Sequence, residues 1–185
     1  MKYKCITGGP ISENCYLLID EKTNQAAVVD PGFLNDVLLN EIKKYAVQRI
    51  LLTHGHFDHI WEADRLHEML GVPVCAYETE AAFAADDKQN GSLLMMYESI
   101  TCKVHEAFKD GETFQIGEVP VTVLHTPGHT AGGVSYITPD AVFTGDTLMG
   151  YSVGRCDLPT GNSAELRESL KKLAALPGNP DICGG

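Results

Sequence analysis

The chain has 185 residues, which is enough for one globular domain of ordinary size and too few for two. It carries 14 Lys and Arg against 25 Asp and Glu, so its formal net charge at pH 7 is −11. Phosphate backbones and anionic lipid surfaces would repel such a chain, which argues against a nuclease or a peripheral membrane protein. No apolar run reaches the roughly 18–20 residues that span a bilayer, and the first residues lack the apolar segment of a secretory signal. We therefore expect a cytoplasmic protein that binds neither nucleic acid nor membranes.

The six cysteines give no sign of a disulfide framework or of a structural zinc site. None of them forms a CxxC pair, and a chain of this length can bury a core without covalent links. We expect reduced thiols that pack as small hydrophobic side chains.

In the first half of the chain, apolar strand-like segments alternate with amphipathic helical ones, and turn residues separate them. The pattern predicts strands at residues 26–29, 49–53 and 72–77, and helices at about 35–45 and 60–70. Gly71 is placed to cap the second helix. This alternation of strands and helices is typical of an α/β domain.

The second half contains two predicted hairpins and a last helix. The hairpins pair residues 114–116 with 119–125, and 133–138 with 141–144. The helix follows Ser163, its predicted N-cap, and its buried stripe is Leu166, Leu170, Leu173 and Leu176.

An apolar patch at residues 92–99 has three interpretations: ordinary packing, a lid over a substrate pocket, or a subunit contact. We favour packing. We find no linker or internal repeat, so we expect one domain spanning residues 1–185.

Three histidines and an aspartate lie within residues 54–59, directly after the predicted strand at 49–53. Neutral imidazole and carboxylate groups are common ligands for zinc and similar divalent metals. A loop after a strand can bring such groups to one point while the sheet holds them rigidly. The alternative is an exposed polar turn that is rich in histidine by chance. Because three of the seven histidines are concentrated here, we favour a metal site.

Two later segments place further metal-ligating residues just beyond strand ends. His129 lies in the turn Thr126-Pro127-Gly128-His129-Thr130, and Asp146 ends a strand in Gly145-Asp146-Thr147. Each turn alone is a weak signal, because most Gly-His and Gly-Asp turns have no ligand role. Their combination with the histidine cluster is far more specific.

With these motifs, the sequence resembles the metallo-β-lactamase-fold hydrolases, in particular the glyoxalase II-like (hydroxyacylglutathione hydrolase-like) branch. The resemblance covers nearly the whole chain. The matching segments are residues 13–16 (ENCY), 29–32 (VDPG), 54–59 (HGHFDH), 126–130 (TPGHT), 145–147 (GDT) and 154–159 (GRCDLP). The resemblance implies an α/β fold, a four-layer αββα sandwich of two mixed β-sheets with helices outside, and a metal site at one rim.

The resemblance also implies a set of metal ligands. Those of the first metal are His54, His56 and His129. Those of the second metal are Asp58 and His59, with Asp146 bridging the two ions. Asp58 and Asp146 are also the expected catalytic carboxylates.

One ligand of the family pattern is missing. The family usually supplies a further histidine to the second site from a C-terminal Gly-His-Gly-Pro segment, whereas this chain reads Ile182-Cys183-Gly184-Gly185. We expect that the sequence stops within the family's last C-terminal motif. A weakly bound second metal is the alternative, and Cys183 as a replacement ligand is a further, less favoured one. The chain also lacks the helical domain with which glyoxalase II binds much of its glutathione, so glutathione specificity does not follow.

Several other polar residues have two interpretations. Arg155 can bind a substrate carboxylate through its planar guanidinium or pair with Asp157. His67 and His105 are expected at the surface, whereas His125 shares an alternating apolar face and is expected in the core.

The resemblance favours a metallo-hydrolase that acts on a small-molecule thioester or another activated ester. A metal, with zinc expected and iron or manganese possible, would activate a water for attack on the carbonyl, and Asp58 would orient that water. The alternative is a mononuclear iron persulfide dioxygenase that uses His54, His129 and Asp146. A lactonase or phosphodiesterase on the same metal site is a further alternative.

Overall fold

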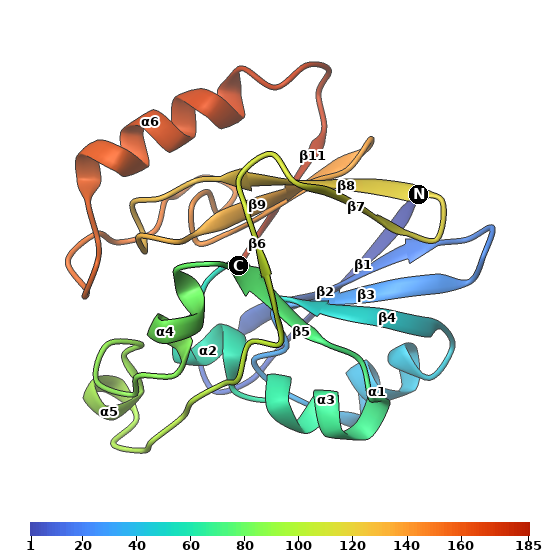
Figure 1. Ribbon diagram of the computed structural model, residues 1–185, viewed down its shortest axis with the longest axis horizontal. Coiled ribbons are helices and arrows are strands. Elements are labelled where there is room, and N and C mark those ends of the chain that lie inside the picture. The colour runs from blue at the N-terminus through green and yellow to red at the C-terminus, as the bar shows by residue number, and fades with distance from the viewer.

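The computed structural model describes residues 1–185 and shows two β-sheets stacked face to face with helices outside them (Figure 1). The first sheet contains, in spatial order, β1 (Lys2–Gly8), β2 (Glu13–Asp20), β3 (Gln25–Val29), β4 (Ala46–Leu51), β5 (Val74–Tyr77) and β6 (Glu106–Phe108). The second contains, in spatial order, β11 (Asp181–Gly184), β10 (Ala141–Gly145), β9 (Val134–Ile137), β8 (Val119–His125) and β7 (Thr113–Ile116). Both sheets combine parallel and antiparallel pairs.

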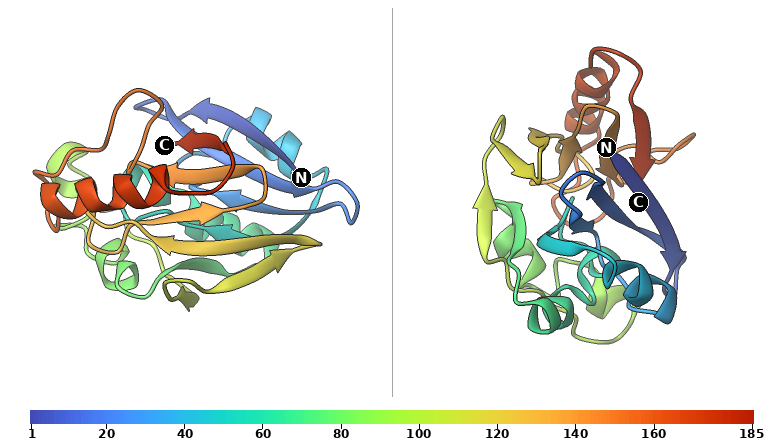
Figure 2. Two further views of the ribbon diagram at one scale, coloured as in Figure 1. Left: turned by 90° about the horizontal axis from the view of Figure 1, so that it is seen from above. Right: turned by 90° about the vertical axis from the view of Figure 1, so that its right-hand side faces the viewer.

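The helices form the outer layers. They are α1 (Asp36–Ile42), α2 (Phe57–Ile60), α3 (Ala63–Leu70), α4 (Glu80–Ala84), α5 (Ser92–Met95) and α6 (Ser163–Ala174). Helices α1 and α3 cover the outer face of the first sheet, and α6 lies over the second (Figure 1, Figure 2). The expected αββα sandwich of two mixed sheets is therefore confirmed.

The central strands are buried on both faces. Because successive side chains of a strand point to opposite faces, alternate residues pack in two different cores, one under the helices and one between the sheets. In β2, Leu17 and Ile19 pack under the helices, whereas Tyr16 and Leu18 point between the sheets. A strand buried on both sides reads as a continuous apolar run, which is why these segments are easy to find in the sequence.

The helix predicted at about residues 60–70 is confirmed as α3, but it begins at Ala63, because Ile60 ends the separate helix α2. The backbone N–H of Glu62 donates to the carbonyl of Pro31 at 3.0 Å, so it bonds outside the helix. Asp58 and His59 consequently lie on the separate short helix α2. The predicted cap of α3 is confirmed, since Gly71 adopts a left-handed φ of 70°.

Two other local predictions need correction. The N-cap of α6 is Asn162, whose side chain accepts hydrogen bonds from the backbone N–H groups of Ala164 and Glu165, and Ser163 is the first helical residue. In the stripe of α6, Leu166 and Leu173 are buried, but the buried side chain between them is that of Ser169 rather than Leu170.

The apolar patch at residues 92–99 does not pack in the core as expected. The side chains of Leu94 and Tyr97 are 65% and 90% exposed, and Met95 is 45% exposed. The segment is anchored by its polar residues instead, because the Ser92 hydroxyl and the Asn90 amide bond to the carbonyl of Ile100. None of the six helices is both long and apolar enough to cross a membrane.

Candidate metal centre

The predicted ligands come from loops that leave both sheets at the same edge of the sandwich. The histidine cluster follows β4, His129 follows β8, and Asp146 directly follows β10. Gly145, which precedes Asp146, has a φ of 48°, and a Cβ there would lie 2.2 Å from the Thr53 hydroxyl. Only glycine allows this close approach, which brings the loops of the two sheets together.

Three of the histidines form a first group of ligand atoms. One imidazole nitrogen from each of His54, His56 and His129 lies within 4.8 Å of the other two, and all three side chains are buried. The Nδ1 of His129 donates to the carbonyl of Arg155 at 2.8 Å, so the lone pair on its Nε2 faces the cluster. That Nε2 lies 2.8 Å from Nδ1 of His56. Burial lowers the pKa of His56 to about 3, with a further contribution from His129, which keeps the ring neutral as a metal ligand requires.

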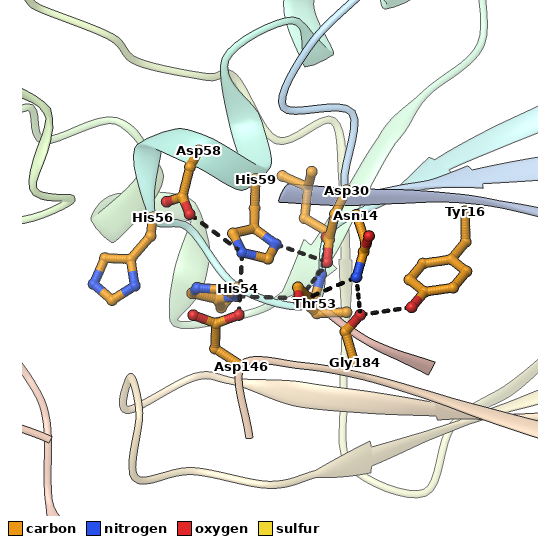
Figure 3. Close-up of polar contacts among 12 residues, drawn as sticks. Asn14, Tyr16, Asp30, Thr53, His54, His56, Asp58, His59, Asp146 and Gly184 are labelled. Carbon is orange, nitrogen blue, oxygen red and sulfur yellow. Dashed lines mark hydrogen bonds and ion pairs between the residues drawn. The ribbon is translucent and has the colours of Figure 1, made fainter. Parts of the chain in front are cut away.

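A second group consists of His54, His59 and Asp146, and Figure 3 shows these side chains converging. The Nδ1 of His59 donates to Asp30 at 3.0 Å, so its Nε2 lone pair faces two carboxylates. The Oδ1 of Asp146 lies 3.3 Å from that Nε2, and the Oδ2 of Asp58 lies 3.6 Å from it. Burial opposes the charged form of His59, but the surrounding carboxylates, with that of Asp58 foremost, raise its pKa well above the ordinary value.

These residues fit a divalent metal. A lone pair that faces two carboxylates needs a cation or a proton between them, and the buried Nε2 of His54 has no hydrogen-bond partner. Imidazole nitrogens and carboxylate oxygens are the donor set that zinc, iron and manganese share. The structure therefore contains a histidine-rich candidate metal site, and it brings all six residues that the sequence singled out to one place. The assignment of each to one ion or the other stays a prediction.

Asp30 positions the second group from the VDPG segment. It has a φ of 51°, a left-handed conformation that aspartate tolerates better than most residues. Its carboxylate accepts hydrogen bonds from the backbone N–H and the hydroxyl of Thr53, at 2.7 and 2.6 Å, and from His59 (Figure 3). The bond from Thr53 also explains why β4 ends at Leu51, two residues before the predicted end of the strand.

Sequence reasoning missed Glu80, a buried carboxylate on α4 that joins the two ligand-bearing loops. Its Oε2 accepts from the backbone N–H of Gly55 at 2.7 Å, and its Oε1 accepts from that of Gly132 at 2.8 Å. Burial raises the pKa of Glu80 against the opposing effect of these bonds. A single glutamate beside alanines carries no local signal of this role, because both partners are distant in the sequence.

A cavity of about 300 Å³ opens above the ligands. His56, Asp58, His129 and Asp146 line it together with Asn90, Arg155 and five apolar side chains, those of Ile11, Phe57, Met95, Met149 and Leu158. Arg155 forms the pair with Asp157, with nitrogen–oxygen distances of 2.6 and 2.8 Å. Its binding to a substrate stays a prediction.

The structure also decides two smaller points, the disfavoured ligand Cys183 and the position of His125. Cys183 packs in the core between the sheets and not beside the ligands, so it is not a replacement ligand. The backbone that follows Cys183 does lie beside the ligands, because a Cβ on Gly185 would lie 2.4 Å from Oδ1 of Asp146. The carbonyl of Gly184 accepts a hydrogen bond from the Tyr16 hydroxyl at 2.6 Å (Figure 3). His125 is half-buried and stacks on Tyr77 rather than packing in the core.

Comparison with known proteins agrees with this geometry. The sequence model of the Metallo-beta-lactamase superfamily matches residues 8–182. The chain belongs to the metallo-β-lactamase superfamily. The resemblance noted from the motifs is therefore confirmed.

Two curated relatives illustrate its place in the superfamily. A probable metallo-hydrolase of Bacillus subtilis is 36% identical over 191 residues, covering 100% of this chain and 90% of the relative. A hydroxyacylglutathione hydrolase of Brucella ovis is 39% identical over 147 residues, covering 78% of this chain and 50% of the relative.

Three solved metallo-β-lactamase-fold structures are similar along almost the entire chain. The BLEG-1 B3 metallo-beta-lactamase has a TM-score of 0.92 at 32% identity, covering 100% of this chain and 91% of that one. The di-iron-bound form of TTHA1623 has a TM-score of 0.82 at 31% identity, covering 98% of this chain and 91% of that one. ETHE1 from Myxococcus xanthus has a TM-score of 0.81 at 28% identity, covering 100% and 75%. The superfamily and the names of the relatives identify the chain as a metallo-hydrolase enzyme.

Proposed function

We propose that this chain hydrolyses a small-molecule thioester with a metal centre, and that zinc is the metal. The observation that carries the proposal is the convergence of two ligand groups, which share His54, at the base of one cavity. The match to a hydroxyacylglutathione hydrolase supports thioester chemistry. When bound, a divalent metal supplies an activated water at neutral pH and an electrophile for the substrate carbonyl.

The protein side chains would hold and orient the reactants. Asp58 lines the cavity, and we propose that its carboxylate accepts a hydrogen bond from the attacking water and directs it at the carbonyl carbon. His129 is held by the carbonyl of Arg155, and His59 by Asp30, so neither ring needs to reorient during the reaction. A thiolate leaves without prior protonation, so the site needs no strong general acid.

Zinc is proposed because the donor set of imidazoles and carboxylates suits it. The same donors accept iron, and the likeness to the di-iron-bound TTHA1623 supports iron as the alternative metal.

The test uses protein loaded separately with zinc and with iron, incubated with a panel of thioesters and oxygen esters. We expect release of free thiol from thioesters, and we expect His129→Ala to abolish it. Metal-loaded protein that leaves every thioester intact would refute the proposal.

A second candidate is a mononuclear iron persulfide dioxygenase, which the likeness to ETHE1 favours. Two histidines and one carboxylate are a typical ligand set of non-haem iron oxygenases, and here they would be His54, His129 and Asp146. One iron per chain together with oxygen uptake on glutathione persulfide, and no thioester hydrolysis, would favour this candidate over the first.

A further inference from the structure

Most of the residues that line the cavity, other than the ligands, are apolar. Besides the ligands themselves, it is lined by Ile11, Phe57, Met95, Met149 and Leu158, together with two polar residues. These five side chains come from separate segments of the chain. At about 300 Å³, the cavity lies at the lower end of the size range for small-molecule sites.

One of the two remaining polar residues, Asn90, is fully buried, and its side chain already bonds within the protein. Its amide nitrogen donates to the carbonyls of Ile100, at 2.7 Å, and Ala84, at 3.4 Å. Its amide oxygen accepts from the backbone N–H of Ser92 at 3.0 Å. The side chain is fully buried and serves to fold the segment that carries α5.

The other polar residue, Arg155, is neutralised by its neighbour. Both of its bonds to the Asp157 carboxylate are short and parallel, in the bidentate geometry that guanidinium and carboxylate groups prefer. The pair therefore offers the cavity no net positive charge. A carboxylate-bearing substrate would have to share Arg155 with Asp157 within a protein of net charge −11.

We infer that the cavity binds an uncharged, apolar group of small size; in the proposed hydrolysis, on which this assignment of its role rests, that group is the acyl chain of the thioester. Met95 on α5 is a specificity-determining side chain, because it lines the cavity while its neighbours Leu93 and Leu94 are exposed and lie outside the lining. Its unbranched, flexible thioether side chain can pack against acyl chains of different shapes. Asp157 disfavours anionic substrates, because it already pairs with Arg155.

The inference is tested by binding, so that it does not depend on turnover. Metal-loaded protein is titrated with S-alkyl thioethers of N-acetylcysteamine of increasing alkyl length, which cannot be hydrolysed. Each added methylene should tighten the dissociation constant about fourfold until the cavity is filled. In the metal-free protein, where no bound cation attracts it, a terminal carboxylate on the alkyl chain should weaken binding by about a hundredfold or more.

Three variants sharpen the experiment. Met95→Ser should weaken the dependence of affinity on chain length, whereas Leu94→Ser, at the exposed neighbouring position outside the cavity lining, should leave it unchanged. Asp157→Asn should free Arg155 and selectively improve binding of the carboxylate-bearing thioether.

The outcomes separate the inference from the proposed function. Affinities that are independent of chain length, or that rise with the terminal carboxylate in the unmodified, metal-free protein, would overturn the inference even if thioesters are hydrolysed. Affinities that rise with chain length while no matching thioester is hydrolysed would support the apolar site and refute the proposed hydrolysis.

Discussion

Replacing Glu80 by glutamine tests whether its carboxylate holds the two ligand-bearing loops together. In the native protein each carboxylate oxygen accepts one backbone N–H, from Gly55 at 2.7 Å and from Gly132 at 2.8 Å. Glutamine keeps one acceptor and turns the other into an NH₂ group, which would face a backbone N–H donor.

The expected loss follows from these two contacts. A hydrogen bond to a charged group contributes about 1.5–3 kcal/mol, and an unsatisfied buried donor costs about 1–3 kcal/mol. Relief of the buried charge, whose desolvation raises the pKa of Glu80, offsets part of this loss. We therefore expect Glu80→Gln to lower the free energy of unfolding by about 2–3 kcal/mol. We also expect metal affinity to fall about 10–100-fold, as is usual when groups that orient ligands are removed.

The assay combines urea unfolding of the metal-free protein with metal titration against a competing chelator. Glu78→Gln is the matched control, since that exposed glutamate lies two residues earlier in the chain. The control should stay within about 0.5 kcal/mol of the parent protein. If both variants unfold alike and bind metal alike, Glu80 does not hold the loops and the reasoning is wrong.

Three further changes test other parts of the structure. A hydrogen bond from the backbone N–H of Glu118 is the main reason that the pKa of Asp20 is lowered to about 2. The stabilisation by the ionised Asp20 carboxylate should be complete above about pH 4 and be lost as the pH falls toward 2. Asp20→Asn should therefore reduce the dependence of the free energy of unfolding on pH in this range, measured by urea unfolding at each pH. Asp30→Asn should lower metal affinity about 10–100-fold in a chelator titration, because His59 loses its charged hydrogen-bond acceptor. Gly132→Ala should lower the free energy of unfolding by about 1–3 kcal/mol in urea, because its Cβ would lie 2.3 Å from a threonine hydroxyl.

The sequence predicted the elements whose signals are local. The doubly buried strands read as apolar runs, and the loop at residues 54–59 concentrates four ligand-type side chains. His129 and Asp146 are distant from that segment in the sequence; their positions beyond strand ends suggested a common site, and the resemblance to a family assigned their roles. The structure then brought all three segments to one edge of the sandwich.

The features that were missed depend on contacts between distant segments. The break before α3 arises because Glu62 bonds to Pro31, and no periodicity encodes that bond. Glu80 bonds to backbone groups, which every residue carries, so its partners cannot be recognised by residue type. The residues that surround α5 are held by the buried side chain of Asn90, while the helix itself exposes Leu94. The hydrophobicity of residues 92–99 alone predicted that this segment packs in the core.

The most direct test of the metal centre is a crystal structure of the metal-loaded protein with anomalous diffraction recorded at the absorption edge of the metal. We expect an anomalous peak among His54, His56 and His129, with any second peak beside His59 and Asp146. A fully metal-loaded protein whose anomalous density lies elsewhere, with these side chains bonded only to one another, would contradict the assignment of the site.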